Sequence, residues 1–201
     1  MDKGPDAYKI TSRDKGFNRF WKWACSRRQA AAKRMREPMA LSPSQSALVE
    51  RIRSAFAGLR VGEDTLLYLS GEAEDSGWNI MDELSLVQLR RLEVRDDWEH
   101  IPPELLSICD DGFTYIDAEG MRYMLPAFMV TSMLHPELEP ELLSIVLTDS
   151  GKAAHLLALL NGEQRACVSD FANEMRLAEI RRYHELIAWN DLLPWEAGAH
   201  K

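Results

Sequence analysis

Residues 17–35 carry the first clear helical pattern along the chain. In FNRFWKWACSRRQAAAKRMRE, apolar residues recur at helical spacing and arginines and lysines fill most other positions. Glu37-Pro38 ends the segment, because the residue before a proline is disfavoured in the α conformation. The pattern predicts a basic amphipathic helix with one apolar face, formed by Phe17, Phe20, Trp21, Ala24, Ala31 and Met35.

Further helices are predicted on both sides of the middle of the chain. A core helix is expected over residues 43–59, because Ser42 is a favourable N-cap and apolar residues follow at helical spacing. Residues 80–94 give another amphipathic helix, with arginines on its polar side. After residue 135 the pattern is helical throughout, and Asn161 is placed to cap a long last helix.

Residues 113–125 interrupt this helical pattern. Apolar and polar residues alternate on either side of the tetrapeptide D-A-E-G, in which Gly120 can take a positive φ. The pattern predicts a small β-hairpin with Arg122 on its outer face. Pro126 is then expected to end the strand and to begin the next helix.

These elements predict a mainly α fold, or α+β with one small β-hairpin. A chain of 201 residues with 46% hydrophobic residues is long enough for one well-buried core. We therefore expect a single compact helical domain over residues 39–201, preceded by a basic helical extension over residues 1–38.

Charge is distributed unevenly between these two parts. Residues 1–38 contain eleven Lys or Arg and four Asp or Glu, a net charge of +7. Because the whole chain carries −8, the other 163 residues carry −15. The basic helix can dock its aromatic face on the acidic body, bind an acidic surface such as a membrane or nucleic acid, or be mobile. The acidic body itself is not expected to bind nucleic acid.

Several classes of function lack the residues they need. No segment reaches the roughly 20 apolar residues of a membrane-spanning helix, and no secretory h-region is present, so a cytoplasmic protein is expected. The cysteines at 25, 109 and 167 lie far apart and never form C-x-x-C, which favours reduced, mostly buried thiols. Metal, nucleotide and hydrolase motifs are missing. We predict no catalytic residue, no cofactor and no metal ligand.

Three stretches resemble a bacterial family of small proteins described only as a domain of unknown function. They are W-x-x-I-P, starting at Trp98, R-Y-x-L-P-A-F-M, starting at Arg122, and LLNGEQRACV at residues 159–168, and the resemblance covers about residues 43–175. It implies no reaction, cofactor or site residue. Its members look like small acidic accessory or immunity-type proteins. We interpret the motifs as a folding signature in which six residues form one core cluster: Trp98, Ile101, Phe113, Tyr123, Leu125 and Phe128.

The function favoured by these observations is that of a non-enzymatic protein-binding module. An acidic body attracts a basic partner over long range, as an immunity protein does when it neutralises a basic toxin or effector. Two acidic clusters and one exposed-looking tryptophan are the predicted partner-binding residues: Glu72, Glu74, Asp75, Trp78, Glu137, Glu139 and Glu141.

Two other classes of function stay open at this point. The first is a regulatory or membrane-surface adaptor that works through the basic helix of residues 1–38. The second is a hydrolase of unrecognised type built on carboxylate pairs such as Asp96 with Asp97 or Asp110 with Asp111. Adjacent carboxylates need a third group brought near by the fold before they can act as acid and base.

Overall fold

The computed structural model describes residues 15–70, 83–106, 116–138 and 151–175. Within these ranges the chain forms helices and short 3-10 turns and contains no strand, which confirms the mainly helical fold. None of the described helices has the length and apolar character needed to cross a membrane. The α-helices are α1 (Lys15–Arg34), α2 (Pro43–Ala55), α4 (Glu83–Leu92), α5 (Pro103–Leu106), α6 (Ala118–Leu134) and α8 (Gly151–Leu159), the 3-10 turns are η2 (Trp98–His100) and η4 (Pro136–Leu138), and residues 162–175 form a further helix.

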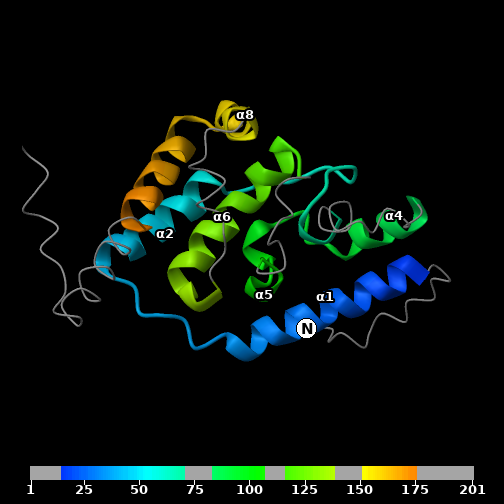
Figure 1. The fold of residues 1–201 in the computed structure, drawn as a ribbon. Coiled ribbons are helices and arrows are strands. Elements are labelled where there is room, and N and C mark those ends of the chain that lie inside the picture. The colour runs from blue at the N-terminus through cyan, green and yellow to red at the C-terminus, as the bar shows by residue number, and fades with distance from the viewer. Residues whose placement is uncertain (1–14, 71–82, 107–115, 139–150, 176–201) are drawn as a thin grey trace, which may run out of the picture.

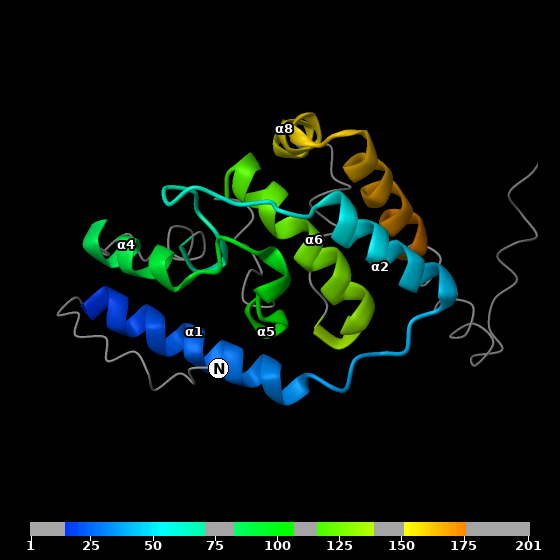
Figure 2. The same ribbon diagram turned by 180° about the vertical axis from the view of Figure 1, so that it is seen from behind.

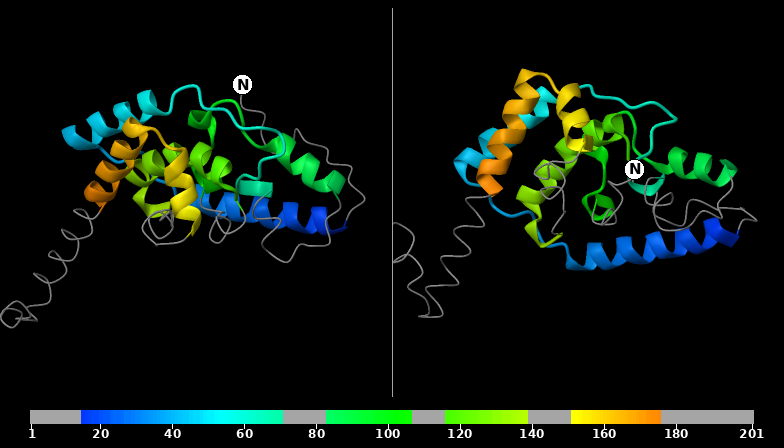
Figure 3. Two further views of the ribbon diagram at one scale, coloured as in Figure 1. Left: turned by 90° about the horizontal axis from the view of Figure 1, so that it is seen from above. Right: turned by 45° about the horizontal axis from the view of Figure 1, so that its top comes forward.

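α6 lies at the centre of the fold. Figures 1 and 2 show α2, α8 and the helix at 162–175 on one side of it, and α5 and α1 on the other. The views of Figure 3 show the same separation of α1 from α2. A helix enclosed in this way buries nearly its whole circumference, and in α6 every residue from Tyr123 to Met129 is buried.

The predicted β-hairpin is wrong where the structure describes it. Residues 113–115 lie outside the described ranges, but residues 118–125 form the first turns of α6. Asp117 is the N-cap, and its Oδ1 accepts a hydrogen bond from the Gly120 N–H at 2.7 Å. Pro126 consequently lies inside the helix and does not begin it. Because α6 is buried on most sides, it lacks the polar face by which an amphipathic helix is recognised.

Gly120 is needed for close packing and not for a turn. The described glycine with positive φ is Gly58, at 71°. A Cβ on Gly120 would overlap the carbonyl oxygen of Leu66 and would lie 2.7 Å from Cγ2 of Ile116. Only glycine therefore allows the start of α6 to approach the 61–67 loop so closely.

The predicted core cluster is confirmed for the five of its six residues that the structure describes. Trp98, Ile101, Tyr123, Leu125 and Phe128 are all buried and belong to one hydrophobic core. Phe113 lies outside the described ranges. The Trp98 indole N–H also donates a hydrogen bond to the carbonyl oxygen of Phe56 at 3.0 Å, which joins η2 to the end of α2. These motif residues therefore hold the helices together.

The N-terminal helix is docked on the body. Phe17 and Phe20 of α1 have no exposed surface, and Ala24 and Ala31 are also buried. α1 packs against α5 and η4 and runs along the bottom of the molecule in Figure 1. Of the three possibilities for the basic extension, the structure shows docking of its aromatic face.

Candidate functional site

A small pocket opens between the 61–67 loop and the C-terminal end of α4. Its volume is ≈ 170 Å³. Besides Val87, its lining consists of three acidic residues and three arginines, whose formal charges balance: Glu63, Asp64, Glu93, Arg90, Arg91 and Arg95. An apolar cleft with a few convergent polar groups is the more usual form of a small-molecule site, and this pocket differs from it.

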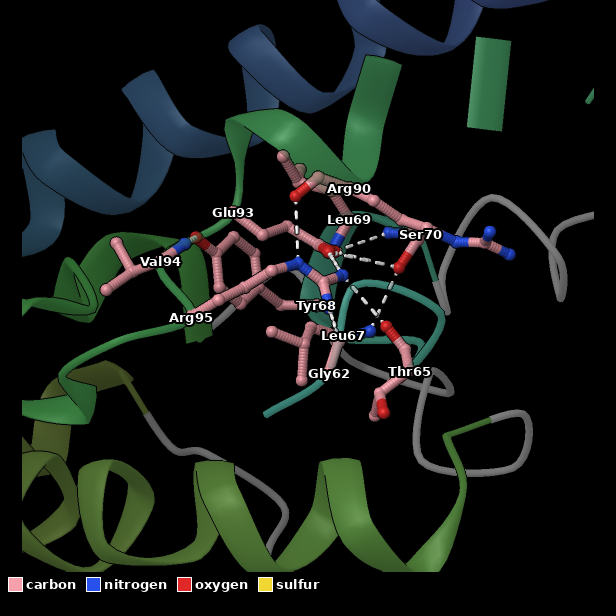
Figure 4. Close-up of polar contacts among 10 residues, drawn as sticks. All are labelled: Gly62, Thr65, Leu67, Tyr68, Leu69, Ser70, Arg90, Glu93, Val94 and Arg95. Carbon is pink, nitrogen blue, oxygen red and sulfur yellow. Dashed lines mark hydrogen bonds and ion pairs between the residues drawn. The ribbon is translucent and has the colours of Figure 1, made fainter. Parts of the chain in front are cut away.

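Glu93 is the most enclosed ionisable group of the pocket. Its Oε1 accepts hydrogen bonds from the main-chain N–H groups of Leu69, at 2.9 Å, and Ser70, at 2.8 Å. The Ser70 hydroxyl donates to the same oxygen at 3.0 Å (Figure 4). Burial raises the pKa of the Glu93 carboxyl, while the hydrogen bonds from Ser70 and the charge of Arg95 oppose that rise.

Arg95 completes the network and joins the 61–67 loop to the end of α4. Its Nε donates to the carbonyl oxygen of Arg90 at 2.9 Å, and its Nη atoms donate to the carbonyl oxygens of Gly62 and Thr65. The guanidinium also pairs with Glu93 Oε2 (Figure 4). Glu93 and Arg95 thus hold the 61–70 segment against the end of α4.

The residues predicted to bind a partner fall mostly outside the described ranges. Glu72, Glu74, Asp75, Trp78, Glu139 and Glu141 all do so. Glu137 is described, and it is half-buried in η4, just after the end of α6. Its Oε1 accepts a hydrogen bond from the Arg36 N–H at 2.9 Å and lies 3.3 Å from His135 Nδ1. The Arg36 hydrogen bond is the main cause of a lowered pKa at Glu137. This carboxylate therefore holds the segment that follows α1.

A second acidic residue meets α1 directly. Glu104 of α5 accepts hydrogen bonds on Oε1 from Arg28 Nε at 3.0 Å and from Arg28 Nη2 at 2.9 Å. The Glu104 side chain is only 14% exposed. Partial burial strengthens such an ion pair relative to one in open solvent. Glu104 thus places a carboxylate against a helix that has seven Lys or Arg and no Asp or Glu, and Glu137 places another against the segment that follows this helix.

Of the side chains that could perform chemistry, Asp97 is held by structural contacts. Asp97 caps η2 by accepting the Glu99 N–H at 3.1 Å, and it also lies 3.0 Å from His100 Nδ1. Burial raises the thiol pKa of Cys25 and of Cys167 above 9.0, which lowers their reactivity as nucleophiles. No group of His, Cys, Asp or Glu suited to hold a metal ion occurs among the described residues.

Sequence reasoning missed the residues that organise these contacts. Glu93 and Arg95 are two positions apart after the end of α4, and no motif marks them as partners of the distant 61–70 segment. Glu104 lies in the W-x-x-I-P-P-E stretch but was assigned no role. The one usable signal was charge, because an acidic body offers carboxylates with which a docked basic helix can pair.

Together these contacts define a mainly helical domain with a basic helix laid across one face. The model of a family of unknown function, DUF6714, matches residues 44–195, and the chain belongs to this family. The match confirms the resemblance to a family of unknown function. It begins after α1 and includes all the other described helices except the first residue of α2. Neither a curated protein nor a solved structure matches the chain.

Proposed function

We propose that the chain is a non-enzymatic protein-binding module of the immunity type, which neutralises a basic toxin or effector by capturing it. The observation that carries this proposal is the net charge of −15 outside residues 1–38. Complementary charge raises the rate of encounter with a basic protein and disfavours acidic ones. A cytoplasmic location, where an immunity protein meets its toxin, is part of the proposal.

The proposed contacts with the partner come from two acidic clusters. In the first, Glu72, Glu74 and Asp75 supply negative charge and Trp78 an aromatic anchor, and aromatic residues often dominate binding energy. The second cluster contains Glu139 and Glu141. Glu137 precedes it, but its hydrogen bond to the Arg36 N–H favours a role in positioning α1.

The geometry gives less support to the other two classes. A membrane-surface adaptor acting through the basic helix would have to release Phe17 and Phe20, which are fully buried, and would leave the apolar face beneath α1 without a helix to cover it. A hydrolase would need a free acid–base pair, and Asp97 instead caps η2 and pairs with His100. Capture of a basic partner is therefore better supported than either a membrane-surface adaptor or a hydrolase.

Affinity capture with the full-length chain tests the proposal. The wild type, Glu139→Lys/Glu141→Lys and the control Glu63→Lys/Asp64→Lys are immobilised and exposed to extract from the source organism at low salt. Both double variants change the charge by +4, and Glu63 and Asp64 are exposed residues outside the predicted clusters.

We expect a basic protein to bind the wild type and the control and to be lost from Glu139→Lys/Glu141→Lys. The captured protein is then purified, and its dissociation constant is measured, with an expected increase of at least about tenfold for Glu139→Lys/Glu141→Lys. Equal affinity for all three chains would refute capture through this cluster. Retention of acidic proteins alone would refute a basic partner.

A further inference from the structure

α1 lies outside the region that defines the family, yet its apolar face is part of the core. The family match begins at residue 44, whereas α1 ends at Arg34. Phe17 and Phe20 are nevertheless fully buried by contact with the body. The matched domain therefore has, beneath α1, an apolar face that accommodates a helix with aromatic anchors. Helix binding in such a groove is a common mode of protein recognition.

The same face selects for a basic helix. Glu104, on α5, is largely buried and receives two hydrogen bonds from Arg28. If α1 left, this largely buried carboxylate would lose both hydrogen bonds from Arg28. Glu137 lies farther along the path of the chain and binds the Arg36 N–H. A helix that replaces α1 with equal affinity must therefore bring aromatic anchors and a cation that restores the contact with Glu104.

α1 is joined to the body by a non-helical connection. Residues 35–42 connect it to α2 without helical structure, and main-chain hydrogen bonds from Arg36 to Glu137 and from Met39 to the Leu134 carbonyl hold this connection. A tethered helix competes with an external one at an effective concentration on the order of millimolar. The helix of a partner must bind tightly enough to replace the tethered α1, and attraction by the acidic body increases its local concentration.

We propose that the face beneath α1 is the docking site for a basic amphipathic helix of the partner, and that α1 is the chain's own occupant, which the partner displaces. This inference rests on the proposed function and names the structural element of the partner that is recognised. It also assigns α1 an autoinhibitory role, because occupancy in cis lowers the apparent affinity for any other helix.

A labelled peptide of residues 15–36 provides the test, because it is itself a basic amphipathic helix and requires no identified partner. Its binding to the full-length chain is followed by fluorescence anisotropy. Phe17→Ala/Phe20→Ala removes the anchors of the cis helix, and this variant should bind the peptide at least about tenfold more tightly than the wild type. Adding Glu104→Lys should reverse the gain, whereas adding Glu50→Lys, an equal charge change at an exposed residue of α2, should not.

A second measurement keeps the test decisive if the double alanine variant does not fold. The wild-type chain is mixed with an excess of the same peptide made with heavy isotopes, and amide hydrogen exchange is measured within α1. Displacement predicts faster exchange across Lys15–Arg34 and unchanged exchange in α6. Arg28→Glu, which breaks the ion pair with Glu104 from a half-exposed position, should enhance this effect.

Three results would overturn the inference. The first is a folded Phe17→Ala/Phe20→Ala chain that binds the peptide no better than the wild type. The second is peptide binding that leaves α1 exchange unchanged. The third is a concentration-dependent dimer of the wild type that this double variant abolishes, which would assign the face to a second copy of the chain. Because the assay uses no partner, failure here leaves capture by the acidic clusters standing, and failure of capture leaves the peptide result standing.

Discussion

Replacing Gly120 with alanine tests the packing of α6 with a single methyl group. The new Cβ would overlap the Leu66 carbonyl oxygen and would lie 2.7 Å from Ile116 Cγ2 and 3.1 Å from Thr65 Cγ2, all closer than ordinary contact. A main-chain carbonyl cannot rotate away as a long side chain can, so α6 or the 61–67 loop must move. Overpacking of this kind costs about 1–3 kcal/mol.

Alanine also gains helix propensity, which offsets part of this cost. Glycine is less favourable than alanine inside a helix by about 0.5–1 kcal/mol. The difference between these two ranges is about 0–2.5 kcal/mol. Because the overlap involves a main-chain oxygen, we expect the upper part of this range, a net loss of about 1–2 kcal/mol in the free energy of unfolding. For a chain of this size, such a loss lowers Tm by about 2–8 °C.

Gly162→Ala is the matched control, because Gly162 also lies at the start of a helix but has no atom within 4 Å of an added Cβ. It should leave Tm unchanged or raise it slightly. Both variants are compared with the wild type by thermal unfolding monitored with far-UV circular dichroism. If Gly120→Ala proved as stable as Gly162→Ala, the close approach of α6 to the 61–67 loop would be wrong.

Three other substitutions probe the core, the buried ion pair and the linker. Phe128→Ala, in the middle of α6, should lose about 3–5 kcal/mol in urea unfolding, and full stability would show that the family-like motif is not a folding signature. Arg95→Met should cost about 3–5 kcal/mol because the buried Glu93 loses its cation, and adding Glu93→Gln should recover part of this loss; no recovery would disprove the coupling. Glu137 has a lowered pKa, so its charge stabilises the fold above the ordinary value of 4.5 and ceases to do so as the pH falls through the lowered pKa. The Tm advantage of the wild type over Glu137→Gln should accordingly disappear in acid, and a constant difference would contradict the role of that charge.

The elements predicted well are those whose sequence signals are local. α2 begins where Ser42 was expected to cap it, and the structure shows a complete capping box in which Ser42 and Gln45 each bond to the other's main-chain N–H. The apolar stripe of α1 likewise identified Phe17 and Phe20 as its buried residues. A cap or a stripe depends on residues within one or two turns, so the sequence contains the whole signal.

The first turns of α6, before Pro126, were missed for a physical reason. The environment of α6 is apolar on nearly every side, so its residues show neither a polar face nor a helical period. Asp117 and Gly120, which start the helix, are also favourable turn residues. Whether these residues form a hairpin turn or start a helix is decided only by contacts with the surrounding helices, which lie far away in sequence.

The polar sites depend even more on distant contacts. Glu93 bonds to residues 69 and 70, and Glu104 pairs with Arg28, across separations of 23 or more residues. No spacing rule connects such residues. The predicted acidic clusters followed from composition alone, and composition did not reveal that Glu137 bonds to the segment after α1.

Capture of a basic partner by the acidic body is the central claim, and the salt dependence of association tests it most directly. Stopped-flow association of the purified partner with the full-length chain is measured over a range of ionic strength. Long-range attraction is screened beyond about 8 Å at physiological salt, so we expect the association rate to fall steeply with added salt while the dissociation rate changes little. Glu72→Lys/Glu74→Lys/Asp75→Lys should lower the rate and flatten this dependence. An association rate indifferent both to salt and to these reversals would contradict electrostatic capture.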